Sequence, residues 1–348
     1  MSVLETSLPD LKSGIALELI QAEAAANELA SAEISTEVKK NFLIALNEKG
    51  ETPAEVAGFA SAFRRLAVKP RLEDFADEAV DVCGTGGDKS HSFNISTAVT
   101  LIVASAGVKV FKHGNRSITS KCGSAELLED LGVQFLTDPK ALRKAMEALN
   151  FVFFFAPNYH PAFKEIMPVR QQLAQEGRRT IFNILGPMIN PGSPSHQLTG
   201  VFSKDWVEPM AEAFHTLGLK KGVVVHTVLD ETRGIDELAC CGKPVSAGFG
   251  ASWEQSIDWN WDDLGLAACS EEDLKGGDLE FNRNLLDELL AGNAPKGLED
   301  TVALNAGVAF SVVGKSSSVK EGIALAREQM LGGAVANHLV KIRDYFTG

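Results

Sequence analysis

Apolar side chains in the N-terminal part of the chain recur every three or four residues, which is the period of an amphipathic helix. Ser35 is a helix cap, and the helix that it starts is expected to end near Lys49, before a glycine. Residues 52–55 (Thr-Pro-Ala-Glu) form a capping box with proline at the first helical position, and an apolar stripe follows over residues 56–63. The pattern predicts a small helical unit.

From about residue 80, short apolar runs alternate with helical patterns. Strands are predicted over residues 79–83, 108–112, 151–156 and 222–227, and helices over residues 96–106, 124–131, 300–310 and 319–330, with another that begins at Pro139. This alternation predicts the α/β class: a small all-helical domain plus a larger α/β domain with a central, mainly parallel sheet covered by helices. We expect the helical domain over residues 1–72, joined in space by a helical segment around residues 162–178, and the α/β domain over residues 73–348.

The length of 348 residues, with 45% hydrophobic and 23% charged residues, suits two ordinary globular domains. The longest apolar run, residues 99–110, is shorter than the roughly 20 residues that cross a bilayer. Acids near the N-terminus do not resemble a signal peptide, so we expect a cytoplasmic protein without a membrane partner. The five cysteines form no CxxC pair and are expected to be reduced and metal-free. The net charge of −13 disfavours nucleic acid as a partner, although a local basic cluster could hold a small phosphate ligand.

Residues 81–88 (Asp-Val-Cys-Gly-Thr-Gly-Gly-Asp) end a predicted strand in a glycine-rich turn. Glycines let backbone N–H groups approach a phosphate, and the turn leads to a helix N-terminus near Asn94 or Ser96 that favours an anion. The hydroxyls of Ser96 and Thr97 suit a phosphate or a magnesium shell. The turn is neither a Walker loop nor a GxGxxG dinucleotide fingerprint. By itself it could equally be only a tight turn.

A basic segment, residues 112–121 (Lys-His-Gly-Asn-Arg-Ser-Ile-Thr-Ser-Lys), follows the next predicted strand. The ends of parallel strands meet at one edge of a sheet, so this segment is expected to face the glycine-rich turn across a shared crevice. A solvated basic loop is the alternative. In so acidic a chain, a basic cluster beside glycines and hydroxyls favours a polyphosphate site.

These two segments together resemble the anthranilate phosphoribosyltransferase family, within the nucleoside phosphorylase/phosphoribosyltransferase superfamily. Residues 154–162 (FFAPNYHPA), which lead to Arg170, and residues 179–187 (RTIFNILGP) are also similar to that family. The resemblance runs from about residue 40 to the end. It implies a pentosyltransferase that moves the 5-phosphoribosyl group from phosphoribosyl pyrophosphate to the amine of anthranilate, releasing diphosphate, in L-tryptophan biosynthesis. It also implies a homodimer formed through the helical domain.

The resemblance further implies a set of ligand-binding positions. Those implied for phosphoribosyl pyrophosphate are Gly84, Gly87, Asp88, Ser92, Asn94, Ile95, Ser96, Thr97, Lys112, His113, Gly114, Asn115, Arg116, Ser117, Ile118, Thr119, Ser120 and Ser124. Gly84, Asn115 and Arg170 are implied for anthranilate, and a guanidinium at Arg170 suits its carboxylate. Two Mg²⁺ ions are implied, held by Ser96, Asp236 and Glu237.

Residues 234–237 (Gly-Ile-Asp-Glu) match the acidic stretch of the family, and paired carboxylates suit magnesium. They lie farther from the preceding strand than is usual, because an insertion brings a competing pair, Asp230 and Glu231. We favour Asp236 and Glu237, since the flanking glycine and isoleucine match. Either pair could instead belong to a solvated loop.

Several alternatives stay open at this point. A second insertion, residues 171–177, is expected to form an extra helical turn after Arg170, and a diverged relative could use another aromatic acceptor. A pyrimidine nucleoside phosphorylase would carry a Lys-His-Ser-Thr-Gly-Gly run in place of residues 83–87, and a non-catalytic relative could bind nucleic acid. His113 and His160 invite a catalytic interpretation, but a structural role is favoured. No catalytic residue is assigned, because an aromatic amine is already neutral at pH 7 and needs no strong base.

Overall fold

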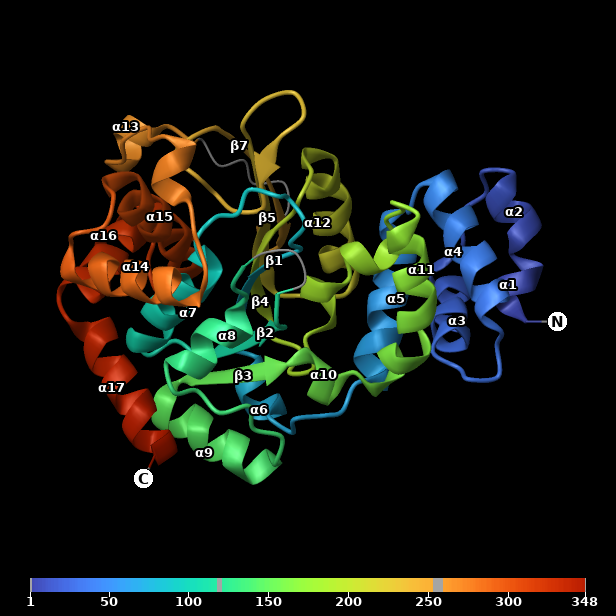
Figure 1. Cartoon of the computed structure of the whole chain (residues 1–348), viewed down its shortest axis with the longest axis horizontal. Coiled ribbons are helices and arrows are strands. Elements are labelled where there is room, and N and C mark those ends of the chain that lie inside the picture. The colour runs from blue at the N-terminus through green and yellow to red at the C-terminus, as the bar shows by residue number, and fades with distance from the viewer. Residues whose placement is uncertain (1, 118–120, 253–258, 348) are drawn as a thin grey trace.

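The computed structural model describes residues 2–117, 121–252 and 259–347. A small helical part lies beside a larger part built around one sheet (Figure 1). The helices of the small part are α1 (Val3–Thr6), α2 (Leu8–Lys12), α3 (Leu19–Leu29), α4 (Thr36–Lys49), α5 (Pro53–Leu66) and α11 (Met167–Gln175). Helix α11 comes from the middle of the chain and packs on α4, where the Lys39 ammonium donates to the Glu165 carbonyl at 3.0 Å.

The predicted caps of α4 and α5 are confirmed. The Ser35 hydroxyl accepts from the N–H of Val38 at 3.3 Å, and α4 ends at Gly50, whose φ of 88° suits a residue without a side chain. Thr52 and Glu55 cap the start of α5 reciprocally, with Pro53 at its first position. Local sequence therefore fixes both ends of this helical hairpin.

The sheet is mainly parallel, as the sequence predicts. Its strands are β1 (Val80–Gly84), β2 (Val110–Gly114), β3 (Phe151–Phe155), β4 (His196–Gly200), β5 (Lys221–Val228), β6 (Gly234–Ile235) and β7 (Lys243–Gly250). The spatial order is β3-β2-β1-β4-β5, and these five run parallel. Strands β6 and β7 both pair antiparallel with β5. The carboxyl ends of β1, β2 and β4 therefore lie side by side at one edge.

Helices cover both faces of this sheet (Figure 1). The helices of the larger part are α6 (Glu73–Ala76), α7 (Ile95–Ser105), α8 (Ser124–Asp130), α9 (Pro139–Leu149), α10 (Ala156–Tyr159), α12 (Val207–Thr216), α13 (Trp261–Leu264), α14 (Leu279–Ala291), α15 (Lys296–Val312), α16 (Val319–Leu331) and α17 (Ala334–Thr347). Short 3-10 turns lie at η1 (Pro161–Glu165), η2 (Ile181–Asn183), η3 (Gly186–Ile189), η4 (Lys204–Trp206) and η5 (Glu271–Leu274). The predicted helices are present. The helix expected over residues 300–310 extends farther in the N-terminal direction, since α15 begins at Lys296.

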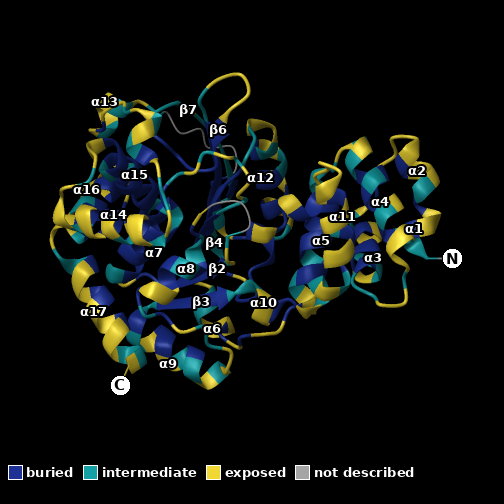
Figure 2. Ribbon diagram, in the orientation of Figure 1, coloured by how far each residue is buried: buried dark blue, intermediate teal, exposed yellow. Residues whose placement is uncertain are grey.

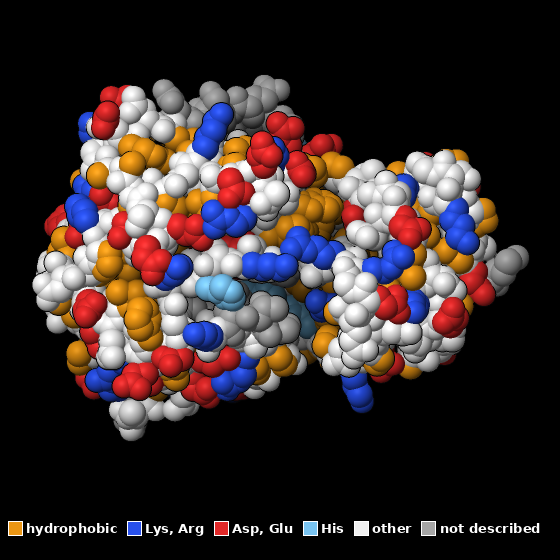
Figure 3. All heavy atoms as spheres, turned by 45° about the horizontal axis from the view of Figure 1, so that its top comes forward, with side chains coloured by type: hydrophobic (Ala, Val, Ile, Leu, Met, Phe, Trp, Pro, Cys, Tyr) orange, Lys and Arg blue, Asp and Glu red, His pale blue; other side chains and the backbone are white. Residues whose placement is uncertain are grey.

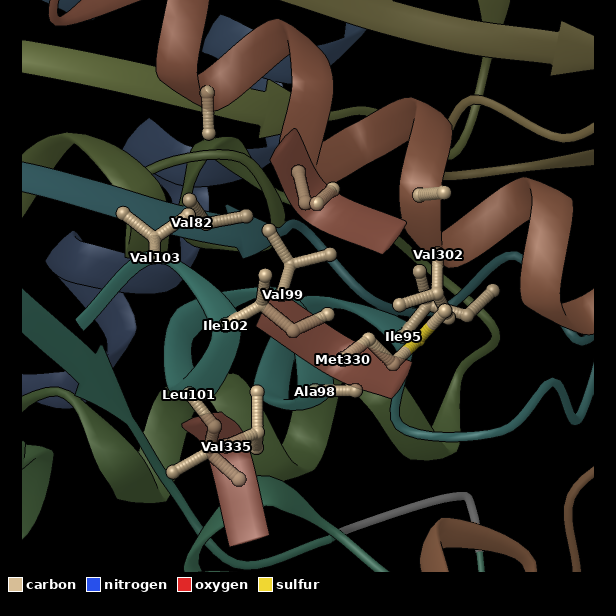
Figure 4. Close-up of a cluster of buried hydrophobic side chains, with 14 of the residues drawn as sticks. Val82, Ile95, Ala98, Val99, Leu101, Ile102, Val103, Val302, Met330 and Val335 are labelled. Carbon is tan, nitrogen blue, oxygen red and sulfur yellow. The ribbon is translucent and has the colours of Figure 1, made fainter. Parts of the chain in front are cut away.

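The largest hydrophobic core lies between the sheet and α7, α15, α16 and α17. Val99 of α7 lies in its centre, with Val302 of α15 and Met330 of α16 nearby (Figure 4). A second core joins the small helical part to α12, β5 and β7. Strands β1 to β5 are mostly buried, and exposed residues concentrate on the outer faces of the helices (Figure 2). No helix in the described residues is long and apolar enough to cross a membrane.

Candidate active site

The strands β1, β2 and β4 each end in a glycine at the same edge of the sheet: Gly84, Gly114 and Gly200. A methyl group on Gly84 would come within 2.9 Å of the Asp236 carboxyl carbon, and one on Gly114 within 3.0 Å of the Phe153 ring. On Gly200 it would overlap the Asp236 carbonyl. The missing side chains of Gly84 and Gly200 thus let the segment carrying Asp236 pack directly on the ends of β1 and β4.

The glycine-rich turn is anchored at several points to neighbouring strands. The N–H of Thr85 donates to the Gly200 carbonyl at 2.9 Å, and the N–H of Gly86 donates to the Asp236 carboxylate at 2.7 Å. Gly86 and Gly87 have φ values of 69° and 80°, a conformation that favours glycine. The turn leads, as predicted, to α7, whose N-cap is Asn94.

Three acids meet beside this turn: Asp88, Asp236 and Glu237. The N–H of Asp236 donates to the Asp88 carboxylate at 3.2 Å, and Asp236 and Glu237 are only 9% and 7% exposed. Burial raises the pKa of Asp236 well above its usual value, and the charges of Asp88 and Glu237 raise it further. Burial also raises the pKa of Glu237 to about 8, although the charge of Lys112 opposes this rise. A cation bound here would therefore favour the ionised carboxylates.

The carboxylates beside the glycine turn fit magnesium better than they fit a metal whose ligands all come from the protein. Within the described ranges, no three His, Cys, Asp or Glu side chains form a ready-made metal cage. Mg²⁺ in proteins commonly uses one or two carboxylates and completes its shell with water and substrate phosphates. Two buried acids beside a phosphate-type loop match that habit.

The competing acid Asp230 lies elsewhere. It is on the exposed turn between β5 and β6, where its carboxylate accepts from the Arg233 guanidinium at 2.8 Å. Hydrogen bonding by the backbone N–H of Thr232, and then by Arg233, lowers the pKa of Asp230. Arg233 is also paired with Glu271 at 2.9 Å. The glycine turn is thus in contact with Asp236 rather than with the inserted acid.

Lys112 places a buried cation among the acids. Its side chain is 2% exposed, and its ammonium donates to the Val82 carbonyl at 2.8 Å and to the Ser96 hydroxyl at 3.3 Å. Asp81 lies on its other side, where burial raises the pKa of the Asp81 carboxyl to about 6 and Lys112 opposes the rise. Lys112 therefore links the strand end, the start of α7 and the acidic centre.

The other positions predicted to bind phosphoribosyl pyrophosphate fall into two groups. At the start of α7, Ser96 is half-buried, while Ile95 lies in the hydrophobic core and can offer only its backbone (Figure 4). The Asn94 amide donates to the Cys122 carbonyl at 3.2 Å, and the Ser92 hydroxyl accepts from Ser90 at 3.2 Å. Thr97 is buried, and its hydroxyl has no hydrogen-bond partner in the part of the chain that is described.

In the basic segment, the Arg116 guanidinium is paired with Glu129 at 2.8 Å, on the exposed side. The N–H of Ser117 donates to Glu126 at 3.2 Å, and the Ser124 hydroxyl donates to the Asn115 carbonyl at 3.5 Å. The predicted positions Ile118, Thr119 and Ser120 lie outside the described residues.

Aromatic rings and uncharged histidines lie near Arg170, on the side of the small helical part. The Arg170 guanidinium is 5.8 Å from the Phe163 ring centre and 5.4 Å from that of Phe182, and burial lowers its pKa. The rings of His113 and His160 pack edge to face at 5.1 Å. Burial lowers the pKa of His113 to about 3 and that of His160 to about 4, so both are neutral at pH 7. Their Nε2 atoms are buried without a partner among the described residues.

This pairing of His113 with His160 was not predicted from the sequence. The face in Figure 3 shows histidine and hydrophobic side chains, with several Lys and Arg side chains, where the two parts of the molecule meet. An aromatic carboxylate would suit such surroundings, because the rings can contact an apolar body and the guanidinium can pair with a negative charge.

Comparison with known proteins identifies the family. Residues 8–67 match the helical bundle domain of a glycosyl transferase family, and residues 76–336 match the a/b domain of that family. The anthranilate phosphoribosyltransferase of Persephonella marina is 41% identical over 306 residues, 88% of each chain. The chain belongs to the anthranilate phosphoribosyltransferase family.

Solved structures of this family share the fold. The crystal structure of anthranilate phosphoribosyltransferase from Thermus thermophilus covers 100% of both chains, with a TM-score of 0.88 and 37% identity. The Saccharomyces cerevisiae enzyme, in complex with PRPP and Mg, covers 99% of this chain and 96% of its own, with a TM-score of 0.77 and 24% identity. The predicted fold class, a small helical part and a larger α/β part, is confirmed.

Proposed function

We propose that this protein transfers the 5-phosphoribosyl group of phosphoribosyl pyrophosphate to the amine of anthranilate, giving N-(5-phosphoribosyl)anthranilate and diphosphate in L-tryptophan biosynthesis. One observation carries the proposal. The glycine turn, Lys112 and the buried acids at the strand ends are connected, through Lys112 and its neighbour His113, with the aromatic side chains around Arg170. The sequence relatives that share most of the chain carry this activity in their names.

The chain's own residues act mainly by positioning and by electrostatics. The N-terminus of α7 stabilises negative charge on the departing diphosphate, together with those N–H groups of the glycine turn that do not donate to Gly200 or Asp236. Arg170 orients the acceptor through its carboxylate. The neutral histidines His113 and His160 add polar atoms without a charge that would repel the oxocarbenium-like sugar. Holding both reactants in one crevice supplies much of the remaining rate.

We place Mg²⁺, as two ions, at Ser96, Asp236 and Glu237, with Asp88 close by. Bound magnesium supplies charge neutralisation for the diphosphate. The raised pKa values of Asp236 and Glu237 support this assignment, since a nearby divalent cation offsets the burial, and the smaller charge repulsion, that raise them.

We also propose that the protein is a cytoplasmic homodimer that associates through the helical domain. This domain comprises residues 1–72, joined in space by the helical segment around residues 162–178, and residues 73–348 form the α/β phosphoribosyltransferase domain. Two isoleucines of the small part support the dimer: Ile15 is 55% exposed and Ile20 is 74% exposed. Sedimentation measurements on Ile20→Asp and on the wild type test it. A monomeric wild type at micromolar concentration would contradict the proposal.

The activity is tested by following anthranilate fluorescence with phosphoribosyl pyrophosphate and Mg²⁺. We expect a loss of fluorescence that needs protein, donor and metal together, and that is greatly slowed in Arg170→Ala. Arg170→Lys should recover only part of the activity, because lysine lacks the planar fork that matches a carboxylate. Donor binding by calorimetry without any loss of fluorescence would mean that the acceptor is another aromatic amine.

A further inference from the structure

Arg179 joins the acceptor side of the site to the glycine turn. It lies between α11 and η2, in the segment that carries Arg170. Its guanidinium donates to the Gly87 carbonyl at 3.0 Å and lies 3.8 Å from the ring centre of Phe202. An arginine stacked this closely on an aromatic face is held in one plane, which fixes the direction of its N–H groups.

Phe202 is itself attached to the same turn. Its backbone N–H donates to the Thr85 hydroxyl at 3.0 Å, while the Thr85 N–H donates to the Gly200 carbonyl. Phe202 therefore contacts the turn in two ways: its backbone binds Thr85 directly, and its ring holds Arg179, which binds Gly87. Two points of the turn are tied to the exit of β4 by one aromatic residue.

The turn needs such ties, because its two central glycines have many accessible conformations. In a trans peptide the C=O and the following N–H point in opposite directions. Fixing the Gly87 carbonyl on Arg179 therefore also fixes the direction of the Asp88 N–H and the position of the Asp88 Cα. On the other side, the Gly86 N–H is fixed by Asp236.

We propose that Arg179, stacked on Phe202, is a positioning residue that holds the glycine turn in the shape that receives the diphosphate of the donor. This inference rests on the proposed function. Arg179 acts through the backbone of Gly87, not by touching the reacting atoms. Because it belongs to the segment of Arg170, it also connects the acceptor pocket to the donor loop.

The neighbouring arginine provides a matched control. Like Arg179, Arg178 is exposed and carries one positive charge, but its guanidinium is paired with Glu48 of α4 at 2.9 Å. Removing Arg178 therefore takes the same charge from the same segment and leaves the contact with Gly87 in place. An exposed pair of this kind contributes little to stability.

The experiment compares Arg179→Ala, Arg179→Lys, Phe202→Leu, the double variant Arg179→Ala/Phe202→Leu, and Arg178→Ala. For each, kcat and the KM of both substrates are measured by anthranilate fluorescence, and folding is checked by thermal unfolding. We expect Arg179→Ala to raise the KM of phosphoribosyl pyrophosphate about tenfold, the effect of one charge-assisted hydrogen bond. The KM of anthranilate should change far less.

Phe202→Leu should give a similar rise, and the double variant should be no worse than either single variant, because both residues act in one unit. Arg179→Lys should recover little, and Arg178→Ala should behave like the wild type. Full recovery by lysine, additive effects in the double variant, or an unchanged donor KM in Arg179→Ala would each overturn the proposal.

Calorimetric titration with phosphoribosyl pyrophosphate and Mg²⁺, without acceptor, separates this inference from the proposed function. If the wild type binds the donor but does not consume anthranilate, the acceptor assignment fails, and the loop-positioning proposal is still judged by the donor affinity of the variants. Equal affinity in wild type, Arg179→Ala and Phe202→Leu would refute the positioning role.

Discussion

Replacing Gly200 by alanine tests how closely the acidic segment must approach the sheet. Gly200 is the last residue of β4, and an added methyl group would overlap the carbonyl of Asp236 and lie 3.1 Å from the Glu237 nitrogen. Real Cβ atoms essentially never approach other atoms within 3.0 Å. The obstructing atoms are backbone, so the peptide that joins the two acids has to move away.

The expected effect follows from that displacement. The Asp236–Glu237 peptide must retreat by about 1 Å or more, and a misplacement of about 1 Å at an active site costs roughly 100-fold in rate. Overpacking a buried site also costs about 1–3 kcal/mol. In a protein of this size that corresponds to a fall in Tm of roughly 1–4 °C. Gly200→Ala should therefore remain folded at room temperature while losing at least about 99% of its kcat/KM, with a higher magnesium requirement.

The assay is anthranilate consumption across a range of Mg²⁺ concentrations, with thermal unfolding of the same samples. Gly218→Ala is the control for stability alone, since Gly218 has a φ of 76° and no atom within 4 Å of an added methyl group. That strain costs roughly 1–2 kcal/mol, far from the site. A Gly200→Ala enzyme with wild-type kcat/KM and wild-type magnesium dependence would refute the close-approach reasoning.

Three further predictions concern metal, pH and stability. Asp236→Asn should raise the Mg²⁺ concentration needed for half-maximal activity at least tenfold, whereas Asp230→Asn should leave it unchanged; the reverse order would favour the inserted acid. The depressed pKa values of His113 and His160 stabilise the fold above pH 6.5, and this contribution is lost as the pH falls towards 4 and 3. The free energy of unfolding in urea should therefore rise with pH by about 1.4 kcal/mol per pH unit for each histidine. Replacing both histidines by glutamine should reduce this slope. Glu55→Ala leaves the buried ammonium of Lys49 without its ion-pair partner and should lower the free energy of unfolding in urea by about 3–5 kcal/mol. A loss below about 1 kcal/mol would contradict a stabilising role for this ion pair.

Local signals in the sequence were sufficient for α4, α5, α7, α8, α9, α15 and α16 and for strands β1, β2, β3 and β5, whereas α12, α14, α17, β6 and β7 were not predicted. Capping residues and apolar periods act within a few positions, so α4 and α5 could be placed from Ser35 and Thr52. Strand β4 was missed because its sequence is polar, with His196, Gln197 and Thr199 in five residues. The Gln197 amide N–H donates outside the strand, to the Pro187 carbonyl at 2.6 Å, whereas the Gln197 Oε1 and Thr199 hydroxyl are buried without a partner among the described residues. No local pattern reports such a partner.

The candidate site divides in the same way. The glycine turn and the acidic stretch are continuous motifs, so the sequence indicated both and the structure brings Gly86 and Asp236 together. The stacking of Arg179 on Phe202 and the pairing of His113 with His160 depend on how two strand ends and a loop approach one another. Histidine and arginine have many ordinary roles on a surface, and only the three-dimensional arrangement distinguishes these.

The shared core of the small helical part affects the order in which the chain can fold during synthesis. Residues of α3, α4 and α5 pack with Ile166, Val169 and Leu173, and with Phe214 of α12. Likewise β1 pairs with β2 but also with the much later β4. A nascent chain of roughly 100 residues therefore has neither a complete helical core nor a complete sheet. Its apolar surface stays exposed until the second half of the chain has been synthesised. Residues 1–72 produced alone should accordingly associate or remain partly unfolded, and adding residues 160–225 in trans is the direct way to supply the missing surface.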